Sequence, residues 1–157
     1  MTPRTASRDR GGNVLLEFAL TTSLMMFLLF GTFQFGQALL TYNNLVNAVR
    51  HGARYASMAK ISNSGNAVLS NAYIDAARNA VVYGDPFVTD SNQTPIVAGL
   101  TPSQVDVQVE FDAGNVPRMV TVRLNSYTIN AIGTNFTIQN KPSLQMSFLG
   151  KYCSTGC

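Results

Sequence analysis

The sequence is short of charged residues. Asp, Glu, Lys and Arg make up 12% of its 157 residues, about half of the 25% that is usual in soluble domains. A disordered chain combines low hydrophobicity with high net charge. Here 46% of the residues are hydrophobic and the net charge is +3, so the composition argues against disorder. The length corresponds to one compact domain, or to a small domain with an appendage.

Histidine and cysteine are scarce, which removes most catalytic and metal-binding chemistry. The one histidine, His51, falls on the polar side of an expected helix, and no Ser–His–Asp arrangement can be assembled around it. The two cysteines and this distant histidine do not supply a zinc site. The acidic residues of the segment 106–112 make only a weak case for calcium. We therefore expect no enzymatic activity, no metal site and no cofactor.

Basic residues are concentrated at the N-terminus. Arg4, Arg8 and Arg10 lie within the first ten positions, and the later basic residues are scattered among acidic ones. A nucleic-acid-binding surface needs a basic patch, often with interleaved aromatic side chains. The sequence has no such stripe, so nucleic acid is not an expected partner.

A long apolar run follows the basic head. Between Gly11 and Val49 the only charged residue is Glu17. A helix over Asn13–Phe33 would span about 31 Å, enough to cross the hydrocarbon core of a bilayer. The basic head would stay in the cytoplasm by the positive-inside rule. We predict a single membrane span over residues 13–34, with residues 35–157 outside the cytoplasm.

A secretory signal peptide and a plain uncleaved anchor are the competing interpretations of this run. A signal peptide has an apolar region of about 7–15 residues that ends in a small-residue cleavage site, whereas this run continues through Phe35–Leu39 without one. Neither interpretation explains Glu17, because a carboxylate inside a span costs about 2.5–3.5 kcal/mol and usually marks function. Hydration near the headgroups, or pairing with Arg10, would be a structural explanation for Glu17.

Glu17 lies in a recognisable string. Gly12 is followed by Asn-Val-Leu-Leu and then by Glu17 and Phe18, and a short charged segment precedes it. This string resembles the class III signal of type IV pilins and pseudopilins, in particular the TadE-like proteins of the tight-adherence (Tad, Flp) pilus system. The resemblance implies that a prepilin peptidase cuts after Gly12. Residues 1–12 would then be a cleaved basic leader, and Asn13 the first residue of the mature chain.

A second segment extends the resemblance. FGQAL at positions 35–39 and NAVRHGARYA at positions 47–56 are similar to the TadE-like pattern FG-x-A-L…N-A-x-R-x-G-A-R-Y-A, and the likeness is loose beyond Ala56. It implies a membrane-anchored minor pseudopilin of a Tad/Flp-type pilus assembly or secretion apparatus, with a role in pilus biogenesis and adherence. The implied partners are the prepilin peptidase, other pilins or pseudopilins, and inner-membrane pilus assembly proteins, in homo- or hetero-oligomers.

Cleavage after Gly12 would give Glu17 a natural partner. The new α-amino group of Asn13 is positively charged, and Glu17 lies one helical turn further along on the same face. In a bilayer an amine and a carboxylate are each costly alone and less costly as a pair. We assign Glu17 and its neighbour Phe18 to assembly, with Glu17 of one subunit neutralising Asn13 of the next.

The rest of the chain predicts an α+β fold of pilin type. The long N-terminal helix, transmembrane and then amphipathic, should continue past the membrane, because apolar residues recur every 3.5 positions. This stripe comprises Phe35, Leu39, Tyr42, Val46, Val49, Ala53 and Ala56. A loop over 62–66, a second helix over 68–82 and an irregular connector over 84–103 should follow. Alternating residues predict strands over 105–111, 118–127 and 144–149 in a small antiparallel sheet packed on the helices.

The two cysteines form a C-x3-C pair at positions 153 and 157. Outside the cytoplasmic membrane they would meet oxidising conditions, so we expect a disulfide between Cys153 and Cys157. Two free thiols, or bonds to a partner subunit, are the alternatives.

These expectations place the protein in a bacterial inner membrane, with a periplasmic C-terminal domain. Incorporation into an extracellular pilus is compatible with the same topology. The main alternative function is an uncleaved, membrane-tethered periplasmic binding or sensor domain.

Overall fold

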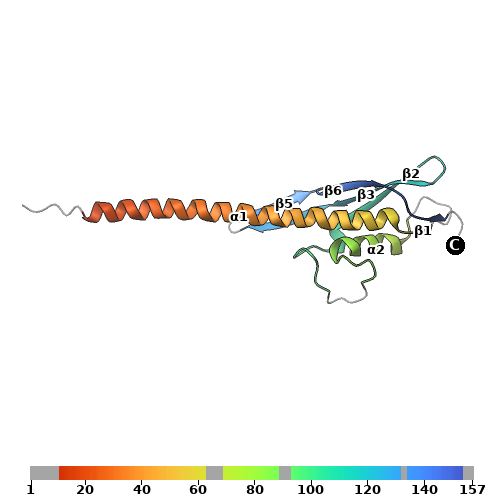
Figure 1. Cartoon of the computed structure of the whole chain (residues 1–157), viewed down its shortest axis with the longest axis horizontal. Coiled ribbons are helices and arrows are strands. Elements are labelled where there is room, and N and C mark those ends of the chain that lie inside the picture. The colour runs from red at the N-terminus through yellow and green to blue at the C-terminus, as the bar shows by residue number, and fades with distance from the viewer. Residues whose placement is uncertain (1–10, 63–68, 89–92, 132–133, 154–157) are drawn as a thin grey trace, which may run out of the picture. The chain divides into compact units, whose positions relative to one another are not determined.

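The computed structural model describes residues 11–62, 69–88, 93–131 and 134–153, and its contacts divide the chain into two compact units, Met1–Gln37 and Ala38–Cys157. The fold is of the predicted α+β, pilin-like class, as Figure 1 shows. In chain order the elements are α1 (Gly11–Met58), β1 (Ile61–Ser62), α2 (Asn71–Val82), the 3₁₀ helix η1 (Pro102–Gln104), β2 (Val105–Phe111), β3 (Pro117–Leu124), β4 (Ser126–Ala131), β5 (Thr134–Gln139), β6 (Ser143–Ser147) and β7 (Tyr152–Cys153).

Helix α1 runs for 48 residues. The chain has no proline between Pro3 and Pro86, so each backbone N–H of α1 can serve as a helix donor. In the first unit every side chain over residues 12–33 is exposed, although most of them are apolar. A helix that is hydrophobic all round needs an apolar environment, which in a single exposed helix is typical of a membrane span.

The second unit holds the hydrophobic core. Strands β2, β3 and β6 form an antiparallel sheet in that order, with Val107 opposite Val122 and Val120 opposite Met146. The predicted alternation in β2 and β3 is confirmed, because Val105 and Val107 of β2 and Val120, Val122 and Leu124 of β3 are buried, while Val109 and Phe111 at the end of β2 are half-buried. The most deeply buried residues of the core include Leu45, Val49, Ala53, Ala77, Val81, Val120, Val122 and Leu124.

The strand predicted over 118–127 is in fact two strands, because the backbone of Asn125 leaves the ladder. The Asn125 N–H donates to the carbonyl of Gln104 at 2.8 Å, and the Asn140 N–H donates to the carbonyl of Asn125 at 3.0 Å. The chain therefore enters a second antiparallel hairpin, β4–β5. The sequence analysis missed this hairpin.

The buried face of α1 in the second unit is shifted from the predicted stripe. Val49, Ala53 and Ala56 are buried as predicted, but Phe35 and Leu39 are exposed and two other members of the stripe are only half-buried. Leu45, Ala48 and Gly52 are buried beside them instead. A straight helix has 3.6 residues per turn, so its apolar face drifts from a 3.5-residue stripe. The sheet and α2 also cover a wider face than a coiled-coil partner would.

The last carbonyl groups of α1 accept hydrogen bonds from segments that are distant in sequence. The last carbonyls of a helix have no partner within it. Here the hydroxyl of Tyr73 donates to the carbonyl of Ala56 at 2.7 Å, and the N–H of Leu149 donates to the carbonyl of Ser57 at 2.8 Å. Beside this end, β1 pairs in parallel with β7.

The second helix begins later than predicted. Helix α2 starts at Asn71, after Ser70 in extended conformation at the N-cap, while residue 68 lies outside the described residues. Ser62, predicted as loop, belongs to β1, and residues 63–66 also lie outside the described part. The strand predicted over 144–149 is observed as β6, Ser143–Ser147.

Candidate functional site

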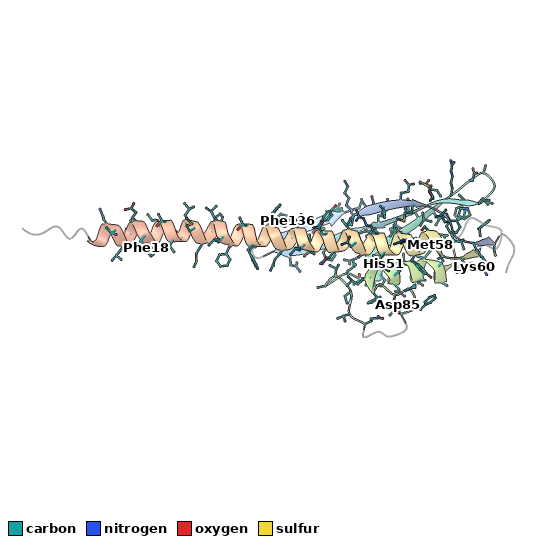
Figure 2. All side chains as sticks on the ribbon, in the orientation of Figure 1. Phe18, His51, Met58, Lys60, Asp85 and Phe136 are labelled. Carbon is teal, nitrogen blue, oxygen red and sulfur yellow. The ribbon has the colours of Figure 1, made fainter. Side chains whose placement is uncertain are left out.

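The residues predicted for processing and assembly all lie in the first two turns of α1. Gly12, Asn13, Glu17 and Phe18 are exposed, and the ring of Phe18 projects from the helix in Figure 2 with 68% of the residue accessible. Among the described residues, no atom outside the local helix backbone lies within 4 Å of the position that a Cβ would take at Gly12. Residues 1–10 of the predicted leader lie outside the described residues, so cleavage after Gly12 stays a prediction.

Three hydroxyl groups in this part of α1 donate hydrogen bonds within the helix itself. The Thr21 hydroxyl lies 2.9 Å from the carbonyl oxygen of Glu17 and 3.0 Å from that of Phe18. Ser23 and Thr32 each donate to a carbonyl three residues earlier, at 2.9 Å. A donor without a partner in hydrocarbon costs several kcal/mol. These internal bonds therefore make the polar side chains of Thr21, Ser23 and Thr32 compatible with lipid.

Glu17 differs from these residues because its carboxylate carries a charge. Ion pairs join Asp75 to Arg78 and Asp106 to Arg123, whereas Glu17 takes part in no ion pair with the described residues. The remaining structural explanation, a pair with Arg10, falls on a residue outside the described part. Within the described residues, one stretch of Gly12–Met58 is apolar and long enough to cross a membrane. Glu17 lies near its start.

The NAVRHGARYA segment, residues 47–56, forms the seam along which α1 packs against α2. Its small residues Ala48, Gly52, Ala53 and Ala56 are buried, and a Cβ built at Gly52 would collide with the side chain of Val81 on α2. Small side chains let two helix backbones approach closely. The motif therefore specifies the docking of α2 as well as the continuation of α1.

The basic residues of the same motif lie on the exposed side of α1. Arg50, His51 and Arg54 are exposed, and Figure 2 labels His51 on the helix surface. Among the described residues, no group of three or more His, Cys, Asp or Glu side chains is placed to hold a metal ion.

Tyr73 connects the motif to α2 by a buried hydrogen bond. Only 6% of Tyr73 is accessible, and its hydroxyl bonds to the carbonyl of Ala56. Burial raises the pKa of Tyr73 well above its usual range, and the neighbouring Tyr55 adds to the rise. Burial also raises the pKa of Tyr55 itself. Both tyrosines are therefore neutral hydrogen-bonding groups at physiological pH.

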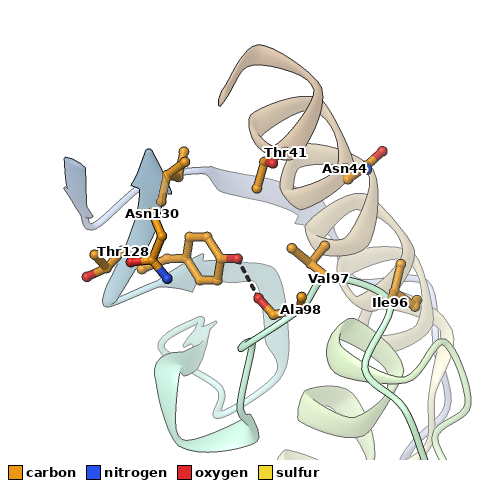
Figure 3. Close-up of a pocket in the computed structure, with 9 residues that line it drawn as sticks. Thr41, Asn44, Ile96, Val97, Ala98, Thr128 and Asn130 are labelled. Carbon is orange, nitrogen blue, oxygen red and sulfur yellow. Dashed lines mark hydrogen bonds between the residues drawn. The ribbon is translucent and has the colours of Figure 1, made fainter. Parts of the chain in front are cut away.

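A hollow of about 280 Å³ lies between α1, the segment 96–98 and β4. Figure 3 shows that its lining includes Thr41 and Asn44 of α1 on one side and Thr128 and Asn130 of β4 on the other. The hydroxyl of Tyr127 donates to the carbonyl of Ala98 at 2.7 Å, the dashed line in Figure 3, and burial raises the pKa of Tyr127. The hollow has no charged lining residue. The hollow could not be predicted from sequence, because three separate segments form it.

The first cysteine of the C-x3-C pair lies in the short strand β7. Cys153 is disulfide-bonded, whereas Cys157 lies outside the described residues. The specific pairing of Cys153 with Cys157 therefore stays a prediction.

Comparison with known proteins agrees with the N-terminal geometry. Residues 12–54 match the model of a family described as TadE-like protein. No curated protein and no solved structure matches the chain. The matched range contains Glu17, the apolar part of α1 and the buried small residues Ala48, Gly52 and Ala53. Over residues 12–54, the chain is therefore similar to the TadE-like family.

Proposed function

We propose that the protein is a membrane-anchored minor pseudopilin of a Tad/Flp-type pilus assembly or secretion apparatus. The TadE-like match indicates a pilus-associated protein with a structural role and a membrane-type N-terminal helix. The observation that carries the finer proposal is Glu17, a lone carboxylate near the start of an exposed apolar helix, five positions after Gly12. A plain anchor or a signal peptide does not require a carboxylate in its apolar segment, and inserting one into the bilayer costs free energy.

In this proposal, residues 13–34 cross the inner membrane with the N-terminus in the cytoplasm. The unit Ala38–Cys157 then lies in the periplasm. The disulfide at Cys153 supports this topology, because disulfides persist in the periplasm and are rare in the cytosol.

Assembly uses the charge that processing creates. Removal of residues 1–12 by the prepilin peptidase creates a free α-amino group at Asn13. The carboxylate of Glu17 in a neighbouring subunit forms an ion pair with this amino group. A stagger that leaves either group unpaired in hydrocarbon is disfavoured, so the pair sets the axial register of the subunits. The protein thereby contributes to pilus biogenesis and adherence.

The intact mass of the purified chain tests the processing step. Co-expression with an active prepilin peptidase should give a product that begins at Asn13, and Gly12→Val should block its formation. Gly31→Ala is the matched control, because Gly31 lies in the same helix with equally open surroundings and should be processed normally. Retention of Met1 in the unaltered chain would instead support the uncleaved, membrane-tethered binding or sensor domain.

The distribution of the mature protein between sheared pili and inner membrane tests the assembly role. Deletion should abolish piliation and surface adherence, and the unaltered protein should restore both. Normal piliation in the deletion strain would contradict the proposal.

A further inference from the structure

A cleft of about 290 Å³ lies between α1 and the start of β6 in the second unit. Its lining is apolar over Tyr42, Val46, Val49 and Leu144, and it carries the cationic side chains of Arg50 and Lys141. No carboxylate of the described residues lines it. The volume is at the lower end of the range for ligand pockets, which suits a single inserted side chain.

The two cations of this cleft have no partner within the described part of the chain. Within these residues, neither the guanidinium of Arg50 nor the ammonium of Lys141 makes an ion pair or a hydrogen bond. Two like charges beside an apolar floor favour an occupant that is acidic and carries an apolar group.

The turn Asp85–Phe87 has this composition. It follows α2, and 76% of Phe87 is accessible. The Asp85 carboxylate is exposed and accepts a hydrogen bond from the Phe87 N–H at 2.9 Å, which holds the acid and the aromatic residue in one tight turn. The other carboxylates on helix α2 and at the start of β2, Asp75 and Asp106, are paired with arginines.

The turn cannot reach the cleft of its own chain. In Figure 1, α2 and β6 lie on opposite sides of α1, and Figure 2 labels Asp85 on the side of α2. An exposed aromatic residue and an unpaired cationic cleft on separate faces are complementary between two copies of the chain.

We propose that the Asp85–Phe87 turn of one copy docks into the Arg50–Lys141 cleft of a second copy. The ring of Phe87 covers the apolar floor, and the Asp85 carboxylate pairs with the two cations. The contact joins different surfaces of the two copies, so it is heterologous, and repetition gives a ring or an open helical array. The inference rests on the proposed function in one respect, since it requires several copies in one membrane.

Photo-crosslinking of the full-length chain in its membrane tests this contact. Benzoylphenylalanine introduced at position 87 should give a covalent dimer on illumination, with the adduct on residues 42–50 or 141–144 of the second copy. Arg50→Glu should lower the dimer yield about tenfold. Arg54→Glu is the matched control, because Arg54 is exposed one turn further along α1 and does not line the cleft; it should leave the yield unchanged.

A charge exchange separates docking from general damage to the fold. Asp85→Lys should also lower the yield, and co-expression of Asp85→Lys chains that carry the crosslinker with Arg50→Glu chains should restore it. Asp85→Asn, which keeps an oxygen acceptor for the Phe87 N–H, isolates the loss of charge.

Several outcomes would overturn the docking proposal: no dimer, an adduct with lipid or with an unrelated protein, or no rescue by the exchanged charges. The crosslink should form in cells with and without the prepilin peptidase. In cells that contain the peptidase, a dimer in which Met1 is retained would uphold the docking and refute the processing, so the two proposals fail separately.

Discussion

Gly52 of α1 lies directly against Val81 of α2, at a distance that leaves no room for a side chain. A Cβ built at position 52 would overlap a γ-methyl of Val81 and would lie 3.2 Å from the Val81 backbone nitrogen. Val81 is fully buried. The glycine of the TadE-like motif is thus explained by the close approach of two helices.

Gly52→Ala should destabilise the second unit by about 1–3 kcal/mol, because the added methyl group overpacks the seam. Thermal unfolding of the full chain in detergent, followed by circular dichroism, measures the effect. Val81→Ala in the same chain should recover part of the loss, since it removes the overlapping methyl groups. Gly36→Ala, at a helix position with no neighbour within 4 Å, should be neutral or slightly stabilising. Equal effects at both glycines would refute this account of the seam.

Tyr73 should make stability fall at alkaline pH. Its pKa is raised in the folded state, so above about pH 10 the unfolded chain releases the tyrosine proton before the folded chain does. The stabilisation is complete below pH 10 and is lost as the pH rises toward the folded-state pKa. Tyr73→Phe should cost about 1–2 kcal/mol near neutral pH, because the Ala56 carbonyl loses its donor.

The Tyr73→Phe chain should show a shallower alkaline decline than the unaltered chain. Chemical denaturation at pH 8, 10 and 11 gives both free-energy curves. Parallel curves above pH 10 would exclude Tyr73 as the titrating group.

Glu17→Ala should leave processing after Gly12 largely intact and lower the amount of protein in sheared pili at least about tenfold, because an unpaired amine in a bilayer costs several kcal/mol. Glu17→Asp keeps the charge and should retain most of the assembly. Intact mass reports processing, and immunoblots of sheared and membrane fractions report assembly. Normal pili from the alanine variant would refute the hypothesis that the Asn13–Glu17 ion pair sets the axial register of the subunits.

Cys153 should form its disulfide with Cys157 in the same chain. Non-reducing peptide mapping should recover the two cysteines in one linked fragment, whose mass rises by about 2 Da on reduction as two protons are gained. Cys157→Ser should leave Cys153 reactive toward maleimide. A covalent dimer through Cys153 would show instead that the bond joins subunits.

Features with a local signal were predicted from sequence, and features that depend on distant partners were not. The alternation of Val105 and Val107 with polar neighbours identified β2, because one face of a strand is buried. The two-residue strands β1 and β7 are too short to show any period. The break at Asn125 depends on bonds to Gln104 and Asn140, neither of which is adjacent to it.

The same distinction applies to the candidate site. Gly12 and Glu17 stand out because a charge is rare in an apolar run and the string around them is specific. The role of Gly52 could not be read from its motif, since its partner Val81 lies on another helix. The cleft at Arg50 was missed because Lys141 reaches it from a distant part of the chain.

The internally bonded hydroxyls of α1 affect how one such helix would meet another. At Thr21, Ser23 and Thr32 the hydroxyl protons are already donated within the helix, so these positions have no donor left for a neighbouring helix. In a bilayer, two copies would then meet few obstacles to sliding along their axes. The charge of Glu17 would then be the main feature of the span that fixes the axial displacement between one subunit and the next.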